Sequence, residues 1–257
     1  MSSDSTTESP VRPGHPTPDE VPRFVLPLVV RIEKGAPPAR TDALETAARA
    51  VLTMLSDERS LGEGETEGEW ARVMREWQDT QIRKVVRRAR GAEWRRATSL
   101  PGLTLTGTGT GTAAEADPGT MPPPPAEVRV FPPVPLDGWP KELVKLQVSG
   151  TDLDDPEPPP APARDLPILW LSPGLDMSAG KAMAQAGHGA QLVWWELPDK
   201  ERVAWREAGF PLAVRTASPA RWRELASSGL PLVRDAGFTE IAAGSATVVG
   251  DHPALRG

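Results

Sequence analysis

Clusters of proline and glycine divide this 257-residue chain into blocks and limit where a packed core can form. Residues 1–22 are rich in Ser, Thr, Pro and acidic side chains, which predicts a disordered tail. The acidic, proline-rich residues 150–163 predict an extended linker, because repeated prolines and like charges resist compaction. Two candidate domains remain, residues 23–149 and residues 164–257.

The second block alternates apolar runs of strand length with segments of helical periodicity. The expected strands are 166–171, 212–215, 231–234 and 247–249, and the expected helices are 178–195, 200–207 and 219–227. Such alternation predicts an α/β fold in which helices cover both faces of a sheet.

The first block follows the same element order, which indicates an internal duplication. Residues 26–28 (Leu-Pro-Leu) align with residues 166–168 (Leu-Pro-Ile) at an offset of 140, and the helices that follow stay aligned without a gap. Trp94-Arg95 then aligns with Trp222-Arg223 at an offset of 128. A Thr-Gly and proline-rich insertion, within residues 106–125, interrupts only the first block. The alternative is that two α/β units simply share an element order.

The net charge of −6 is distributed unevenly along the chain. Residues 1–22 and 150–160 together carry −7, which leaves the rest of the chain at +1. Within that rest, residues 70–96 hold nine Lys and Arg against three Asp and Glu, and such a patch is suited to contact phosphates. The same residues also fit an ordinary solvated arginine-rich face.

Several site classes and locations are excluded or disfavoured by composition. The chain has no cysteine, so disulfides, thiolate catalysis and sulfur-ligated zinc are excluded. Its three histidines, His15, His188 and His252, lie in unrelated contexts, which disfavours a histidine-rich metal site. The N-terminal stretch lacks the pattern of a signal peptide, and the longest apolar run, residues 24–30, is far too short to cross a membrane. We expect a cytoplasmic protein with no membrane partner.

The segment from Met177 to His188 holds the first candidate site. Ser178 is a favourable N-cap for a helix, and Lys181, Gln185 and His188 then follow at helical spacing on one face. A lysine near a helix N-terminus concentrates positive potential, which suits a phosphate or a developing oxyanion. Alone, the pattern also fits a packed helix with a solvated lysine and a structural histidine.

The segment from Leu232 to Ser245 holds the second candidate site. An apolar strand ends at Arg234 and Asp235, and Gly237 permits a turn that brings Thr239 back toward them. An aspartate and a threonine so placed are able to hold a water molecule. Alone, Asp and Gly after a strand also fit ordinary turn chemistry.

Together, the two segments closely resemble the type II (archaeal/eukaryotic-type) peptidyl-tRNA hydrolases. The resemblance rests on Gly-Lys-x-x-x-Gln-x-x-His in the first segment and Arg-Asp-Ala-Gly-x-Thr-Glu-Ile-Ala-x-Gly-Ser-x-Thr-Val in the second, over about a third of the chain. It implies a hydrolase acting on peptidyl-tRNA, without metal or organic cofactor, on a three-layer α/β/α fold with a small mixed sheet that commonly dimerises. Ala243 and Ala246 depart from the family pattern, which puts the shape of that loop and one phosphate contact in doubt.

The resemblance also implies roles for the site residues. Asp235 would orient or deprotonate the attacking water, and Lys181 would stabilise the oxyanion or a nearby phosphate. Thr239 and Gln185 would position these groups, and His188 would either take part or brace the helix.

The first block lacks these residues, since Lys181, Gln185 and His188 align with Thr41, Glu45 and Ala48. It therefore resembles a degenerate copy that fills the place of a second subunit, so that the fold is present twice as a pseudo-dimer and the chain is a monomer or a homodimer. Two other functions remain open. One is a non-catalytic RNA-binding protein that kept the hydrolase fold, and the other is a hydrolase of a different acyl ester.

Overall fold

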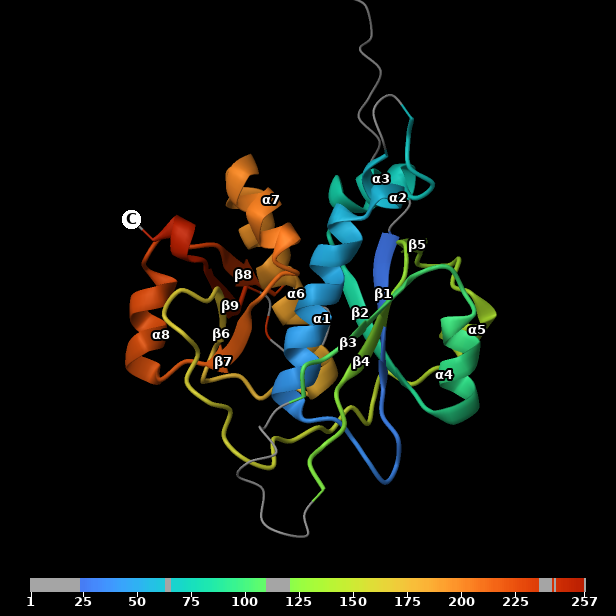
Figure 1. The fold of residues 1–257 in the computed structure, drawn as a ribbon, viewed down its shortest axis with the longest axis horizontal. Coiled ribbons are helices and arrows are strands. Elements are labelled where there is room, and N and C mark those ends of the chain that lie inside the picture. Colours follow the sequence, from blue (N-terminus) through green and yellow to red (C-terminus); the bar gives the residue numbers. More distant parts are fainter. Residues whose placement is uncertain (1–23, 63–65, 110–120, 236–241, 243, 257) are drawn as a thin grey trace, which may run out of the picture.

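The computed structural model describes residues 24–62, 66–109, 121–235, 242 and 244–256 of the chain. Each half forms one mixed sheet, and two long helices, α1 and α6, lie between the sheets (Figure 1). The prediction of an α/β fold with small mixed sheets is confirmed.

The elements alternate in both halves much as their periodicity predicts. The first half contains β1 (Phe24–Arg31), α1 (Arg40–Ser56), α2 (Glu58–Leu61), α3 (Ala71–Gln78), β2 (Lys84–Ala89), α4 (Gly91–Thr98), β3 (Leu103–Thr106), β4 (Glu127–Val130), β5 (Val134–Pro135) and α5 (Lys141–Val144). The second half contains β6 (Ile168–Leu171), α6 (Ala179–Glu196), α7 (Asp199–Glu207), β7 (Ala213–Thr216), α8 (Pro219–Ala226), β8 (Leu232–Arg234), β9 (Ala246–Asp251) and the short 3₁₀ helix η1 (Pro253–Leu255).

The two sheets have the same strand order and the same strand directions. The first runs β2-β1-β4-β3, with β1 parallel to β2 and antiparallel to β4, and with β3 antiparallel to β4; β5 adds a short extra pairing to β1. The second runs β7-β6-β9-β8, with β6 parallel to β7 and antiparallel to β9, and with β8 antiparallel to β9.

Each sheet is covered on both faces, which is why its central strand is apolar at successive positions. In β1, Leu28 and Val30 belong to the core that contains α1, whereas Val29 packs with α4 and α5 on the opposite face. In the second half, Leu169 of β6 belongs to the same core as α6, and α8 covers the outer face of the sheet (Figure 1).

The contact between α1 and α6 joins the halves into one continuous core. Small residues line both helices here, since Ala43, Ala47 and Ala50 of α1 and Ala186 and Gly187 of α6 are all buried. Two further contacts between the halves are reciprocal, because α1 also meets β7 while α6 meets β2, the strand that corresponds to β7.

The acidic, proline-rich segment contributes caps to both central helices, although it forms no helix or strand itself. Asp155 accepts hydrogen bonds from the Thr41 amide (2.8 Å) and the Thr41 hydroxyl (2.7 Å) at the start of α1. Thr151 is buried and its hydroxyl accepts from the amide of Gly180 (3.0 Å) at the start of α6. These bonds satisfy helix-terminal amides that would otherwise lack partners.

Local differences from the expected elements lie mainly in the first half. The apolar residues among 82–86 predict a strand over that range, whereas the observed strand begins at Lys84 and runs to Ala89. The sequence does not predict β5 and α5, because two and four residues are too short to show a periodicity. The first part of the Thr-Gly stretch is held to α1, where Asp42 accepts from the amides of Thr108 (3.1 Å) and Ala126 (2.7 Å). Residues 1–23 and 110–120 lie outside the described residues.

We predict that Gly187→Val destabilises the protein by about 1–3 kcal/mol, the usual cost of overpacking a core. A side chain at Gly187 would place its Cβ 2.9 Å from Val51 Cγ2 of α1 and 3.2 Å from Lys84 Cδ of β2. The measurement is the free energy of unfolding in urea. The control is Gly174→Ala, where no atom lies within 4 Å of the added Cβ and a change below about 0.5 kcal/mol is expected. Equal effects of the two substitutions would contradict close packing at this crossing.

Candidate active site

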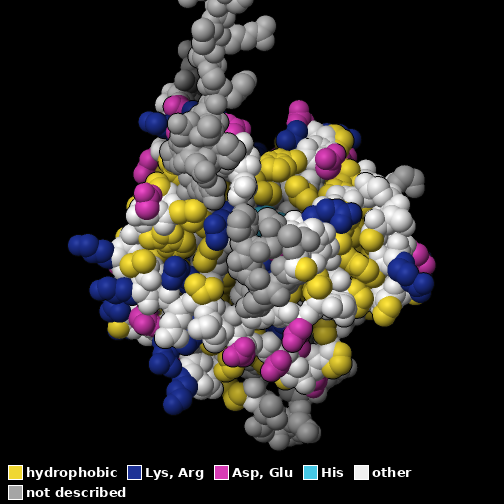
Figure 2. All heavy atoms as spheres, turned by 180° about the vertical axis from the view of Figure 1, so that it is seen from behind, with side chains coloured by type: hydrophobic (Ala, Val, Ile, Leu, Met, Phe, Trp, Pro, Cys, Tyr) yellow, Lys and Arg dark blue, Asp and Glu magenta, His cyan; other side chains and the backbone are white. Residues whose placement is uncertain are grey.

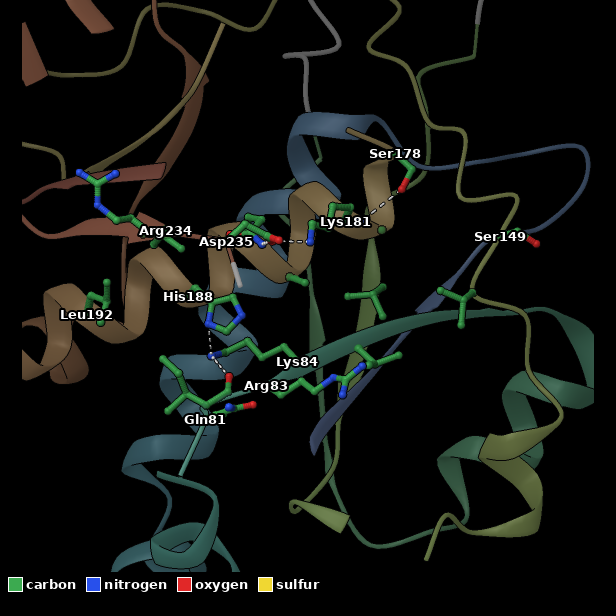
Figure 3. Close-up of a pocket in the computed structure, with 18 of the residues that line it drawn as sticks. Gln81, Arg83, Lys84, Ser149, Ser178, Lys181, His188, Leu192, Arg234 and Asp235 are labelled. Atoms are coloured by element: carbon green, nitrogen blue, oxygen red, sulfur yellow. Dashed lines mark hydrogen bonds and ion pairs between the residues drawn. The ribbon is translucent and has the colours of Figure 1, made fainter. Parts of the chain in front are cut away.

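A cleft of about 790 Å³ lies between the two halves. The second half contributes one side of α6 and the end of β8, and the preceding part of the chain contributes residues 81–86, 148–150 and 152 (Figure 3). Lys181, Gln185, His188 and Asp235 all line this cleft. Four of the five predicted site residues are therefore brought together, whereas Thr239 lies outside the described residues.

The central contact of the cleft is an ion pair between Lys181 and Asp235, residues 54 positions apart in the chain. Lys181 Nζ lies 2.5 Å from Asp235 Oδ2, and their side chains are only 14% and 5% exposed. Removing charges from water is costly, so a pair this shielded needs close contact and further hydrogen bonds. The hairpin between β8 and β9 supports it, because the backbone of Asp235 exchanges hydrogen bonds with Ser245 (2.9 Å) and Gly244 (2.7 Å).

A chain of hydrogen bonds orients the carboxylate of Asp235. Gln185 Nε2 donates to Asp235 Oδ2 (2.7 Å), and Gln185 Oε1 accepts from the Thr247 hydroxyl (2.7 Å). Gln185 and Thr247 are both buried. The carboxylate of Asp235 only accepts, so it requires the NH₂ end of the Gln185 amide, and the Thr247 hydroxyl then donates to the amide oxygen that faces away.

His188 faces the first half of the chain. Its Nδ1 lies 3.2 Å from Nζ of Lys84, a buried residue of β2 (Figure 3). Burial, together with the charges of Lys84 and Lys181, holds the pKa of His188 well below its ordinary value. Burial likewise lowers the pKa of Lys84 well below its ordinary value. His188 is therefore neutral at neutral pH.

The start of α6 differs from expectation in one respect. The first amides of a helix usually lack partners within the helix and are available to an anion. In the structure, Ser178 Oγ accepts from the Lys181 amide (3.3 Å) and Thr151 Oγ1 accepts from the Gly180 amide (3.0 Å). These two amides have protein partners, so the positive charge that faces the cleft here comes from the Lys181 side chain.

Two polar residues of this cleft region were not identified from sequence as site residues. Thr247 belongs to the Gly-Ser-x-Thr-Val part of the second motif and lies on β9, but the resemblance assigned it no role. Lys84 was counted within a basic surface patch, although it is buried beside Trp77, with Nζ 4.9 Å from the centre of the indole ring. Its position among β-branched residues of a strand was the available signal.

The predicted basic patch of the first half does not form one surface. Arg72 pairs with Glu76 (3.0 Å), Arg75 pairs with Glu67, and Arg87 donates to the carbonyl oxygens of Val144 and Leu146. On the face seen in Figure 2, Lys and Arg side chains lie in several separate groups with Asp and Glu among them. Of the predicted patch, Arg83 and Lys84 line the cleft, where Arg234 of the second half also lies.

Residues 168–256 match the family model of peptidyl-tRNA hydrolase PTH2. This PTH2 segment extends from β6 to η1 and includes Lys181, Gln185, His188, Asp235 and Thr247. Lys84 and residues 148–152 lie outside it, so the cleft combines the PTH2 segment with residues from the preceding part of the chain.

Among the residues that the structure describes, no three His, Asp or Glu side chains gather closely enough to hold a metal ion. No helix in the same residues is both long and apolar enough to span a membrane.

We predict that Thr247→Val destabilises the protein by about 1–3 kcal/mol, because it leaves the buried oxygen of Gln185 without its donor. The matched control is Thr53→Val in α1, where the hydroxyl bonds only to the Arg49 carbonyl of its own helix (2.9 Å). We expect the control to cost less than about 1 kcal/mol. The measurement is thermal unfolding of both variants, and equal losses would contradict an orienting role for Thr247.

Proposed function

We propose that the protein hydrolyses the ester that joins a peptide to the 3′ ribose of tRNA. The observation that carries the proposal is the contact between Lys181 and Asp235 in a cleft, within a segment that matches the PTH2 family model. A shielded amine beside a carboxylate supplies the two groups that ester hydrolysis needs, one for the developing oxyanion and one for the water proton.

The proposed reaction balances with water as the only co-reactant. Asp235 takes a proton from water as its oxygen attacks the ester carbonyl carbon, and Lys181 stabilises the oxyanion that forms. Collapse of this tetrahedral intermediate breaks the bond to the ribose oxygen. The leaving oxygen takes up the proton held by Asp235, which yields a free peptide carboxyl and a tRNA with a free hydroxyl.

The remaining site residues support this pair. The buried Gln185 donates a hydrogen bond to Asp235, and Thr247 donates one to Gln185. Thr239 is assigned a positioning role by resemblance to the family pattern. Arg83 and Arg234 line the same cleft, so they are suited to contact the phosphates next to the ester.

We further propose that the first half is a degenerate copy of the second. Three features support this: the identical strand order, the identical strand directions, and the reciprocal contacts of α1 with β7 and α6 with β2. At the corresponding helix of the first half, Asp42 binds loop amides. The described residues of the first half form no lysine–aspartate pair that would correspond to Lys181 and Asp235. If the first half is such a copy, the chain is a pseudo-dimer.

The location of the protein in the cytoplasm remains a prediction from the sequence.

Because α1 and α6 cover each other, we predict that the chain is a monomer in solution. In a homodimeric relative that lacks the first half, the face of the helix that corresponds to α6 would be available to a second subunit. Sedimentation equilibrium should give the mass of one chain across a wide concentration range. A stable dimer would mean that another surface mediates association and would contradict the pseudo-dimer.

The proposed function predicts that Lys181→Met and Asp235→Asn each slow release of peptide from N-acetyl-aminoacyl-tRNA by about 100-fold or more. Both substitutions preserve side-chain shape while removing a charge. Because breaking a buried ion pair costs about 3–5 kcal/mol, rates are measured well below the unfolding temperature of each variant.

The matched controls are Lys145→Met and Asp137→Asn, which remove the same charges from exposed positions outside the cleft. They should release peptide at the wild-type rate. Retention of tRNA in a gel without cleavage would favour the non-catalytic RNA-binding function. Equal cleavage of a small acyl ester would instead indicate a hydrolase that does not recognise tRNA.

A further inference from the structure

A buried lysine of the first half faces the active-site helix of the second. Lys84 lies on β2, outside the segment that matches the PTH2 family model, and its side chain reaches α6. Its Nζ contacts three groups: the Ile82 carbonyl oxygen (3.2 Å), Gln191 Oε1 (2.5 Å) and His188 Nδ1 (3.2 Å). Lys84 is the one cationic side chain of the first half with a described hydrogen bond to His188.

The three contacts match the bonding capacity of an ammonium group. An ammonium has three N–H donors and no acceptor, and two of its partners here are oxygen acceptors that require donors. The Trp77 ring lies 4.9 Å from the same nitrogen, and an aromatic face attracts a cation. Burial opposes the charge by lowering the pKa of Lys84, but these four partners favour the ammonium.

If Lys84 donates to Nδ1 of His188, that nitrogen carries no proton. A neutral imidazole then carries its proton on Nε2. Among the described residues the structure gives Nε2 no hydrogen-bond partner, and His188 lines the cleft. The ring is therefore held with an N–H donor available to a group bound in the cleft.

We propose that Lys84 is a positioning residue for His188, which it holds in the Nε2–H tautomer so that the first half completes the active site. The proposal rests on the proposed function for the identity of the bound group, an oxygen of the acylated tRNA end. It gives the first half a role beyond occupying the place of a second subunit.

Two cations act on His188 in the same direction. Lys84 approaches from β2 and Lys181 from α6 itself, and both disfavour a protonated ring. Asp235, at the end of β8, is paired with Lys181, and Arg83, Arg234 and Asp152 line the same cleft. Removing Lys84 removes a positive charge, so the pKa of His188 must rise.

The test compares Lys84→Met with Arg87→Met in the full chain. Methionine keeps the aliphatic stem of lysine without its donor. Arg87 lies on the same strand, is also partly buried, and bonds to Val144 and Leu146 on the face away from α6. The first readout is the ¹⁵N chemical shifts of the His188 ring against pH, with the signals assigned by their loss in His188→Gln.

Wild type should show an unprotonated Nδ1 and a protonated Nε2 at neutral pH. Lys84→Met should raise the pKa of His188 toward its ordinary value of about 6.5 and mix the tautomers. Arg87→Met should change neither. A protonated Nδ1 in wild type would overturn the proposal, and this outcome does not require any variant to fold.

The second readout is the pH profile of peptide release. Lys84→Met should lower kcat about tenfold, the loss expected for one hydrogen bond in the transition state, and should add a step near pH 6–7 that wild type lacks. An unchanged kcat and profile in a folded Lys84→Met protein would also overturn the proposal. If wild type releases no peptide, the proposed function fails, whereas the ring shifts still decide the role of Lys84.

Discussion

The packing of α1 against α6 is the interaction on which the site depends. It is the most extensive contact between two elements in the part of the chain that the structure describes. Alanine and glycine at the crossing let the two backbones approach closely, and this approach brings the edge strand β2 against α6. Without it, the cleft would lose one wall, and Lys84 would not meet His188.

In the site, hydrogen bonds stabilise two charged side chains, Lys181 and Asp235, that are largely shielded from water. The carboxylate of Asp235 accepts from both Lys181 and Gln185, and Thr247 fixes the Gln185 amide behind them. Lys181 and Gln185 lie on α6 and Thr247 lies on β9, whereas Asp235 directly follows β8 and its backbone is bonded to Ser245 and Gly244. Such rigid support is what lets a lysine and an aspartate keep a fixed geometry in a largely buried place.

The two halves use a similar framework for different purposes. In the second half, the end of the central helix faces a carboxylate supplied by the β8–β9 hairpin. In the first half, the helix supplies the carboxylate, and Asp42 ties down the backbone at Thr108 and Ala126. A carboxylate bound to backbone amides stabilises a loop, and a Cβ added at Gly107 would collide with it.

The sequence by itself determined the α/β fold, most element positions to within one or two residues, and the shared face of Lys181, Gln185 and His188. Periodicity fixes which residues of one helix or strand lie together, because a helix repeats every 3.6 residues and a strand every two. The pairing of Lys181 with Asp235 was expected only through resemblance to a family, since spacing along the chain does not determine contacts between distant elements.

The tertiary structure alone decided the rest. Lys84 reached His188, Thr247 reached Gln185, and Thr151 capped α6, because the halves dock and neighbouring strands pair in a particular register. The arginines expected to form one basic surface instead took separate partners. Contacts of this kind depend on which surfaces meet in three dimensions, and no periodicity within a single segment encodes them.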